Sequence, residues 1–269
     1  FIFYKNCLSN SKFLIKNFSK NKYDIVIHLA AQAGVRESLK KPNSYFKNNI
    51  TSFYNIIYVS SLYKIKKLIY ASSSSVYGQT LKLPSKEKAI TDKPDSFYAA
   101  SKKTNEIIAY SFSSTYKLET IGLRFFSIFG NFGRPDMAYY KFLSKMYNGD
   151  QISLYNKGLH YRDFTHVSEV TSIIKKLIKS KKNMNAIPYD IFNIGSNKPL
   201  SIIKLVKTLE NISGIKAKLK KIKLQKGDVY KTNADNKKII KKLGYKIEKN
   251  FYNQLVDFTK WFKEYHGYE

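Results

Sequence analysis

The segment SFYAASKKTNE, residues 96–106, places Tyr98 four positions before Lys102. On a helix, this spacing puts the two side chains on one face, one turn apart. A lysine ammonium beside a tyrosine favours the phenolate and lowers the pKa of the hydroxyl from about 10 towards neutrality. A pair of this kind could move a proton at neutral pH.

The spacing alone does not identify a functional pair, because the chain contains 22 tyrosines and many lysines. Tyr-x-x-x-Lys occurs three times, at Tyr63, Tyr98 and Tyr245. Only Tyr98 has a hydroxyl-rich segment upstream, the four serines at 72–75, which lie between an apolar run and Val-Tyr-Gly. Asp95 and Ser96 can cap a helix that begins here. We therefore expect the pair at Tyr98 to be the functional one.

The elements that would position this pair alternate between apolar runs and helical patterns. Buried strands are predicted at 23–30, 67–73, 119–130 and 189–195, with helices at 44–63 and 97–116 between them. This order predicts an α/β fold with a doubly wound parallel sheet. Residues 1–127 would form the sheet domain and 128–269 a smaller α+β domain, with strand 189–195 returning to the main sheet.

The second part of the chain has a less regular order. We predict helices at 137–147, 168–181, 201–212, 235–243 and 251–265, and short strands at 151–155 and 162–166. In an open parallel sheet, ligands bind at the carboxyl ends of the strands. The segments HLAAQAGVR, ASSSSVYG and RFFSIFG occupy such ends.

Composition excludes several classes of protein. The single cysteine, Cys7, rules out an internal disulfide and fits a reducing cytoplasm, and four scattered histidines offer no zinc cluster. The net charge of +29 is carried almost entirely by lysines spread along the chain, and arginine occurs at only four positions. Because nucleic-acid surfaces usually exploit arginine, we predict no nucleic-acid partner. No apolar run approaches the roughly 20 residues of a membrane-spanning helix, so we predict no membrane association.

Ser-x-x-Val-Tyr-Gly followed by Tyr-x-x-x-Lys resembles the extended short-chain dehydrogenase/reductases. Within them, the chain most resembles the NAD-dependent nucleotide-sugar epimerases, specifically the UDP-glucuronate 4-epimerases. The segments HLAAQAGVR, YASSSSVYG, YAASKK, LRFFSIFGNFGRPDMA, RDFTHV, FNIGSNKPL and KGDV follow that family in order. The resemblance implies a Rossmann-like fold, NAD as the cofactor and a UDP-sugar substrate.

The resemblance also implies roles for particular residues. Ser73, Tyr98 and Lys102 would be the catalytic residues. The NAD site would be formed by Leu8, Ala30, Ala31, Gln32, Asn48, Ser72, Tyr98, Lys102 and Phe126. The sugar and its carboxylate would contact Ser73, Ser74, Ser127 and Arg134, and the uridine diphosphate would contact Arg162, Gln225 and Asp228. A homodimer through helices near 44–63 and 97–116 is expected as well.

The sequence departs from the family pattern in ways that leave alternatives open. The glycine-rich turn of the dinucleotide fold is absent, Cys7 stands where the family usually has an aspartate, and Ser127 replaces a threonine. Ser74 and Ser75 occupy positions at which relatives that dehydrate or decarboxylate carry an acid, so epimerisation is favoured. The alternatives are a 4-epimerase of a neutral UDP-hexose, a UDP-glucuronate decarboxylase, and a non-enzyme, either an inactive truncated remnant or a basic binding module.

The first residues, FIFY, look like the interior of a strand, and they resemble the third strand of the family fold. We therefore expect a further segment upstream of Phe1 that contains strands one and two and the glycine-rich turn. Without it, the strand at 23–30 would present an open, apolar edge that invites aggregation. The 269-residue chain alone is expected to bind no NAD.

Overall fold

The structure is a computed structural model that describes residues 1–79, 82–223, 229–245, 247 and 250–268. The chain folds into two compact units and passes between them several times. The first unit comprises Phe1–Thr80, Glu87–Phe125 and Leu177–Asn193. The second unit comprises Leu81–Lys86, Phe126–Lys176 and Ile194–Glu269.

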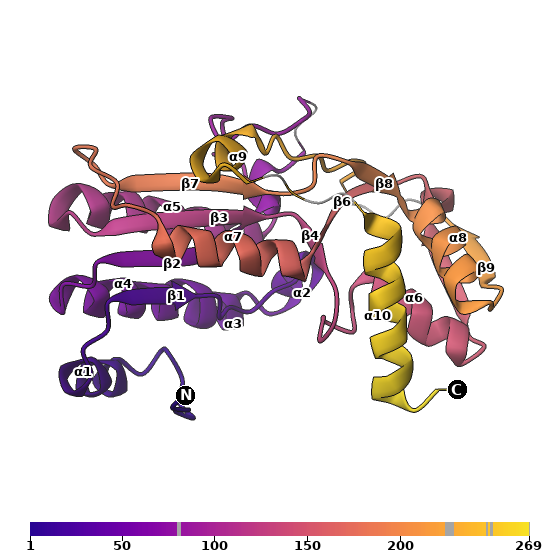
Figure 1. Cartoon of the computed structure of the whole chain (residues 1–269), viewed down its shortest axis with the longest axis horizontal. Coiled ribbons are helices and arrows are strands. Elements are labelled where there is room, and N and C mark those ends of the chain that lie inside the picture. The colour runs from indigo at the N-terminus through magenta and orange to yellow at the C-terminus, as the bar shows by residue number, and fades with distance from the viewer. Residues whose placement is uncertain (80–81, 224–228, 246, 248–249, 269) are drawn as a thin grey trace. The chain divides into compact units, whose positions relative to one another are not determined.

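The first unit is built on a four-stranded sheet with the order β1-β2-β3-β7 (Figure 1). Its strands are β1 (Ile25–His28), β2 (Lys67–Ser73), β3 (Glu119–Phe125) and β7 (Tyr189–Ile194). β2 pairs in parallel with both β1 and β3, and it is buried along its whole length. The parallel register brings the carboxyl ends of β1, β2 and β3 to one edge of the sheet, where the predicted ligand-binding segments begin.

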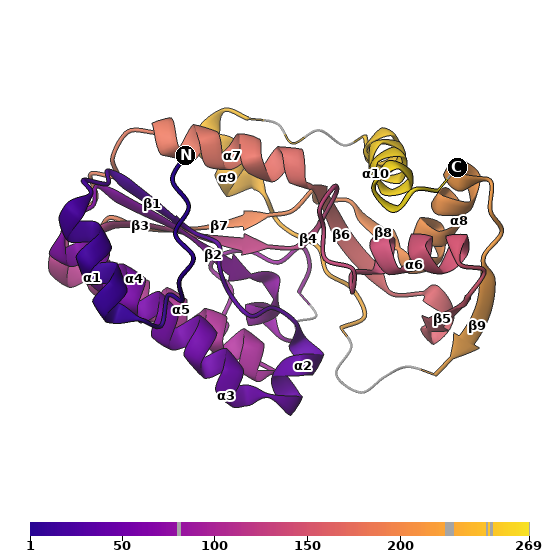
Figure 2. The ribbon, with the colours of Figure 1, turned by 90° about the horizontal axis from the view of Figure 1, so that it is seen from below.

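Helices α4 (Ser52–Leu62) and α5 (Phe97–Tyr116) lie side by side on one face of this sheet (Figure 2). α5 begins where predicted, because the Ser96 hydroxyl accepts a hydrogen bond from the Ala99 amide at 3.1 Å. α4 continues from α3 (Pro42–Tyr45) through a π-helical segment, η1 (Phe46–Thr51). α1 (Ser11–Lys20) packs on α4, α2 (Val35–Lys40) contacts α5, and a 3-10 turn, η2 (Ser74–Tyr77), follows β2.

The second unit contains two small sheets. One has the order β4-β6-β8, with β4 (Ser127–Phe129), β6 (Tyr161–His166) and β8 (Pro199–Ser201). The other pairs β5 (Gln151–Tyr155) in parallel with β9 (Lys218–Ile222). Its helical segments are α6 (Ala138–Tyr147), η3 (Asn156–Gly158), α8 (Ile202–Ser213), α9 (Lys237–Leu243) and α10 (Phe251–His266), while α7 (Val167–Lys179) leads back to the first unit.

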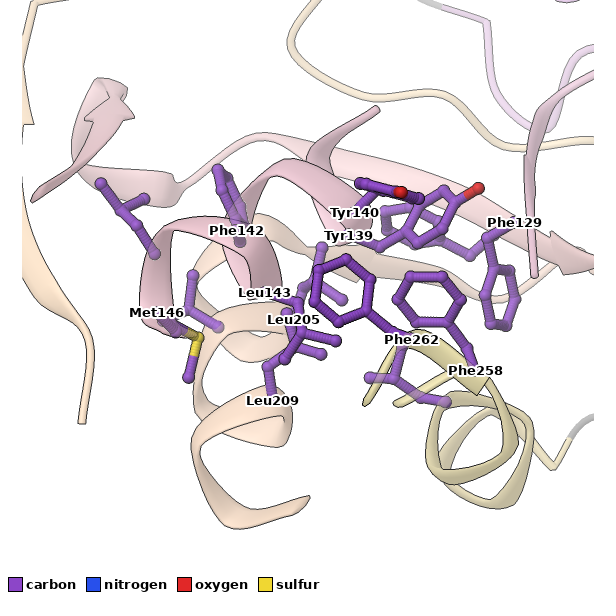
Figure 3. Close-up of a cluster of buried hydrophobic side chains, with 14 of the residues drawn as sticks. Phe129, Tyr139, Tyr140, Phe142, Leu143, Met146, Leu205, Leu209, Phe258 and Phe262 are labelled. Atoms are coloured by element: carbon purple, nitrogen blue, oxygen red, sulfur yellow. The ribbon is translucent and has the colours of Figure 1, made fainter. Parts of the chain in front are cut away.

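An aromatic core holds β4, α6 and α10 together (Figure 3). The ring of Tyr139 lies edge-on to Phe258, with centroids 4.8 Å apart, and to Phe129, at 5.8 Å. Phe262 packs against Tyr140 at 5.1 Å. Such edge-to-face pairs add specific geometry to apolar burial, so the loop between β4 and α6 is fixed at both of its ends.

The structure confirms the predicted parallel α/β architecture and the order of its main elements. The prediction of a strand at Phe1–Tyr4 is wrong, because these residues have no regular secondary structure and their side chains are exposed. In the doubly wound order, strand three pairs with strand two, and no strand of the described residues takes that place. α1, α2, β8 and β9 were not predicted. Within the described ranges, no helix combines the length and apolar character needed to cross a bilayer.

Candidate functional site

Ser73 is the last residue of β2, at the carboxyl-end edge of the first unit's sheet. Its backbone is extended, and its Oγ accepts a hydrogen bond from the Ser75 amide at 3.1 Å. The same hydroxyl donates to Ser75 Oγ at 3.2 Å. The serine run therefore forms an ordered 3-10 turn rather than a flexible linker, and it fixes the hydroxyl of Ser73 at the end of the strand.

Lys102 reaches the same strand end from α5. Its residue is only 2% exposed, and its ammonium donates to the Ala71 carbonyl at 2.8 Å, two residues before Ser73. Burial lowers the pKa of Lys102 to about 8. Tyr98 lies one helical turn earlier and is half-buried. The structure thus brings Lys102 to the serine-rich strand end, with Tyr98 one turn away on the same helix.

Asn49 links the end of β1 to α5, although no sequence pattern pointed to it. Its side chain accepts from the Gln32 amide at 2.7 Å and donates to the Gln32 carbonyl at 3.0 Å. It also donates to the Ser101 hydroxyl at 3.0 Å, and that hydroxyl donates to the Tyr98 carbonyl at 2.8 Å. Asn49 belongs to the π-helical segment η1, and such segments often occur at functional sites.

Two further buried side chains lie at the carboxyl end of β1 and beside the loop that follows it. The hydroxyl of Tyr45 lies 2.9 and 2.8 Å from the carbonyls of Ala33 and Gly34, and its ring packs edge-on against Tyr98. His28 ends β1, and no hydrogen-bond partner is found for its Nε2 among the described residues. Burial, and secondarily the charge of Lys102, lower the pKa of His28 to about 4, so its imidazole stays neutral.

Ser72, predicted to lie at the cofactor, uses its side chain within the protein. Its hydroxyl donates to Glu106 Oε1 on α5 at 2.6 Å. Arg124 on β3 donates to both oxygens of the same carboxylate, each at 2.8 Å. This buried group of three residues joins β2, α5 and β3 through Ser72, the residue before Ser73.

The second unit contributes a loop, residues 130–137, that lines a cavity of about 320 Å³. Gly133 is required there, since a Cβ would collide with the Tyr139 hydroxyl. The guanidinium of Arg134 donates from Nε to one oxygen of Asp136 at 2.9 Å and from a terminal nitrogen to the other. The lining residues outside this loop are Phe126, Ile128, Phe129, Tyr139 and Val167.

The other predicted site residues of the first unit differ in exposure. Ala30 and Ala31 are exposed after β1, and Ser74 is half-buried in the turn η2. Leu8 is half-buried, and its carbonyl accepts from Asn55 at 3.0 Å. Asn48 donates to the Ser44 hydroxyl at 3.1 Å, so the amide that bonds Gln32 belongs to its neighbour Asn49.

In the second unit, Phe126 is buried and its amide donates to the Ile194 carbonyl at 3.1 Å. Ser127 begins β4 and is half-buried. Arg162 donates to the Tyr161 carbonyl at 2.9 Å. Gln225 and Asp228 lie outside the described residues. The catalytic candidates Ser73, Tyr98 and Lys102 therefore belong to the first unit. The described candidates for contacts with the sugar and the nucleotide after residue 125 are Ser127, Arg134 and Arg162, and they belong to the second unit.

The two other Tyr-x-x-x-Lys pairs have structural partners. The ammonium of Lys67 is buried and donates to the carbonyls of Leu177 and Ser180, at 2.8 and 2.9 Å. The hydroxyl of Tyr245 donates to Glu169 at 2.7 Å, and Lys249 lies outside the described residues. Neither tyrosine follows a hydroxyl-lined strand end.

Residues 2–195 match the NAD dependent epimerase/dehydratase family. The chain belongs to this family. It is 37% identical to UDP-glucuronate 4-epimerase 3 of Arabidopsis thaliana, over 97% of this chain and 64% of that protein.

Two solved structures show the same fold. One is the UDP-glucuronic acid 4-epimerase of Bacillus cereus with UDP-glucuronic acid and NAD, with a TM-score of 0.88 and 27% identity over 97% of this chain and 81% of that one. The other is the UDP-glucose 4-epimerase of Thermotoga maritima with UDP-glucose, with a TM-score of 0.92 and 26% identity over 98% and 85%. The Rossmann-like α/β fold, the predicted family and an NAD-dependent enzyme of the epimerase class are confirmed.

NAD is the cofactor of this family, and the first unit carries groups that fit part of it. The Lys102 ammonium has three N–H donors, and the Ala71 carbonyl takes one of them. Tyr98, Gln32 and the Nε2 of His28, for which the described part of the chain offers no hydrogen-bond partner, lie near the ends of β1 and β2. A hydroxyl-rich ribose suits this donor set. The sequence has no glycine-rich turn, so no residue of this chain is assigned to the pyrophosphate.

Proposed function

We propose that the protein interconverts UDP-glucuronate and UDP-galacturonate by inverting the configuration at C4 of the sugar. The observation that carries this proposal is the convergence of Ser73 and Lys102 on the end of β2, with Tyr98 one helical turn away. The similarity to a UDP-glucuronate 4-epimerase along almost the whole chain supports the choice of substrate.

Each catalytic residue has a role that its environment supports. The Tyr98 phenolate would take the proton from the sugar 4-hydroxyl, and the ordered hydroxyl of Ser73 would share a hydrogen bond with that oxygen. Lys102 is largely charged at pH 7, since its pKa is about 8, so it would stabilise the phenolate and hold the ribose. When bound, NAD would supply the acceptor for the C4 hydride and the donor for its return to the opposite face. Tyr98 then gives the proton back.

The second unit would recognise the rest of the substrate. A guanidinium can bind a carboxylate through two parallel hydrogen bonds, which gives Arg134 a reason to be arginine in a lysine-rich chain. Ser127 would contact neighbouring sugar groups, and Arg162, Gln225 and Asp228 the uridine diphosphate. Ser74 and Ser75 provide no acid to drive a further step on the 4-keto sugar, which disfavours decarboxylation.

A neutral UDP-hexose is the second candidate substrate, and one contact favours it. Two guanidinium nitrogens of Arg134 already donate to the Asp136 carboxylate. An acidic sugar has to displace this carboxylate from the guanidinium, while a neutral sugar does not. The likeness to a UDP-glucose 4-epimerase structure fits this alternative equally well.

Incubation with each UDP-sugar separates the candidates. Activity is to be measured on the protein encoded by the complete gene, with proton NMR following the anomeric signals. We expect UDP-galacturonate to form from UDP-glucuronate, with little UDP-pentose. Faster turnover of UDP-glucose would favour the neutral hexose, and accumulation of UDP-pentose would favour a decarboxylase.

We also propose that the protein forms a homodimer through α4 and α5. These helices pack against each other and leave Tyr54, Tyr58, Leu62, Ile107 and Tyr110 substantially exposed. Exposed apolar patches of this kind mark interaction surfaces. Sedimentation should give a dimer, and Tyr110→Glu should yield monomers because it places a charge in the patch. A parent protein that sediments as a monomer would contradict the proposal.

A further inference from the structure

The Glu106 carboxylate is the centre of a fully buried polar network in the first unit. Glu106 and Arg124 are only 2% and 3% exposed. Three N–H or O–H groups donate to the two carboxylate oxygens, one from Ser72 and two from Arg124. Burial opposes the charge of Arg124, but hydrogen bonds to Glu106 and its charge raise the pKa of the guanidinium above its usual value. The guanidinium therefore stays charged, and its hydrogen bonds hold the pair in one geometry.

The remaining terminal nitrogen of Arg124 extends the network away from the catalytic helix. It donates to the Tyr77 hydroxyl at 3.0 Å and to the Glu87 carbonyl at 3.2 Å. Tyr77 donates to the Asn193 side chain at 2.6 Å, and the Asn193 amide donates to the Glu87 carboxylate at 2.9 Å. These contacts close a ring that runs from Arg124 through Tyr77, Asn193 and Glu87 back to Arg124.

Three members of this ring lie where the chain enters or leaves the first unit. Three of the five crossings between the units are at 86/87, 125/126 and 193/194. Glu87 is the first residue after one crossing, Arg124 lies two residues before the next, and Asn193 is the last residue before the third. The Arg124 guanidinium thus contacts the segments of the first unit from which three connections lead to the second unit. It does so directly at Glu87 and through Tyr77 at Asn193.

We propose that Arg124 is a positioning residue that ties these three connections to the catalytic edge of the first unit. Through Glu106 and Ser72 it fixes β2 and α5, which carry Ser73, Tyr98 and Lys102. Through Tyr77 and Glu87 it fixes the segments that lead to the residues assigned to the sugar and the nucleotide. The proposal rests on the proposed function, because positioning matters only if both units contribute to one reaction.

The geometry requires arginine. A planar guanidinium can donate to a carboxylate with two nitrogens and to two further acceptors with the third, whereas a lysine ammonium has three donors on one atom. The same two strands contain a buried ion pair that serves as a comparison. Lys67 and Glu119 are opposite each other at the other ends of β2 and β3, 3.8 Å apart and equally buried. Neither lies within five residues of a crossing along the chain, but the Lys67 ammonium donates to the Leu177 carbonyl, beside the crossing at 176/177.

Two matched substitutions test the proposal. Glu106→Gln and Glu119→Gln each remove one buried negative charge and leave a buried cation. We expect both to lower the melting temperature. Of these two variants, only Glu106→Gln should lower kcat/KM for the UDP-sugar. Arg124→Lys should lower it further, by about 100-fold, because small misplacements of reacting groups have effects of this size. The pH dependence of the remaining activity should stay that of the parent.

Hydrogen exchange supplies a readout that needs no substrate. In Arg124→Lys, peptides that contain the Glu87 and Asn193 amides should exchange at least about tenfold faster than in the parent, because local opening becomes easier. Glu119→Gln should leave them unchanged. If Arg124→Lys does not fold, Tyr77→Phe takes its place, since it removes one hydroxyl and keeps the ring.

Two results would overturn the proposal. One is an Arg124→Lys enzyme that loses stability as Glu119→Gln does but keeps kcat/KM within threefold of the parent. The other is unchanged exchange at both connections in Arg124→Lys or Tyr77→Phe. A parent protein that turns over no nucleotide sugar would instead refute the proposed function, and the exchange measurement would still decide whether Arg124 holds the connections.

Discussion

The guanidinium of Arg134 is held by the carboxylate of Asp136, two residues further along the same loop. Pro135 lies between them, and the Met137 amide donates to the Arg134 carbonyl at 3.1 Å, so a tight turn presents the carboxylate to the guanidinium. The side chains of Arg134 and Asp136 are 46% and 65% exposed. If Arg134 binds the sugar carboxylate, Asp136 competes for the same nitrogens.

Asp136→Asn should therefore lower KM for UDP-glucuronate and leave KM for UDP-glucose unchanged. The gain should be at most about fivefold, because exposed ion pairs contribute about 1 kcal/mol or less. Arg134→Lys should raise KM for the acidic sugar, since one ammonium cannot reproduce the two-pronged contact. Steady-state kinetics with both sugars provide the measurement. A higher KM for UDP-glucuronate in Asp136→Asn would mean that Asp136 orients Arg134 for binding.

Tyr98→Phe should reduce turnover about 100-fold or more while UDP-sugar binding is largely kept, because a positioned acid–base group contributes at this scale. Two tyrosines of the same spacing serve as controls. Tyr63→Phe removes a hydrogen bond to the Ile15 carbonyl at the surface, and Tyr245→Phe removes one to Glu169. Both should keep turnover near that of the parent, with a modest loss of stability for Tyr245→Phe. Activity of Tyr98→Phe within a few-fold of the parent would exclude Tyr98 as the base.

The affinity for NAD should depend on pH through Lys102. Burial lowers the pKa of this ammonium to about 8, so the charge is present below that pH and is lost above it, where an ordinary lysine would stay charged. If the ammonium holds the ribose, affinity should fall above pH 8 by up to about tenfold per pH unit. Lys102→Arg should bind more weakly but without this fall, because arginine keeps its charge. Calorimetric titrations between pH 7 and 9.5 that give one affinity for the parent would contradict the assignment.

The parts of the site that could be predicted from the sequence depend on local patterns. The strand end at Ser73 follows from an apolar run that stops at serines, and the start of α5 follows from the capping residue Ser96. The spacing of Tyr98 and Lys102 then needs only a helix. These features involve neighbouring residues, so the sequence displays them directly.

Other parts depend on contacts between distant segments, and no local pattern displays those. Glu106 and Arg124 belong to different elements, and nothing in either segment indicates that they meet. The strand expected at Phe1–Tyr4 has the right composition, but a strand also needs a neighbour to pair with. Partner availability is a property of the assembled sheet, and composition does not reveal it.

Asn49 and Asn48 provide a direct comparison between a structural and a sequence-based assignment. The resemblance assigned Asn48 to the cofactor, whereas the structure places Asn49 between Gln32 and Ser101. Asn49→Ala should weaken NAD binding at least about tenfold, because it leaves part-buried groups of the Gln32 backbone without their side-chain partner and releases the loop after β1. Asn48→Ala breaks only a hydrogen bond to Ser44 and should change NAD affinity less. An equal or larger loss for Asn48→Ala in the same titration would favour the assignment made from the sequence.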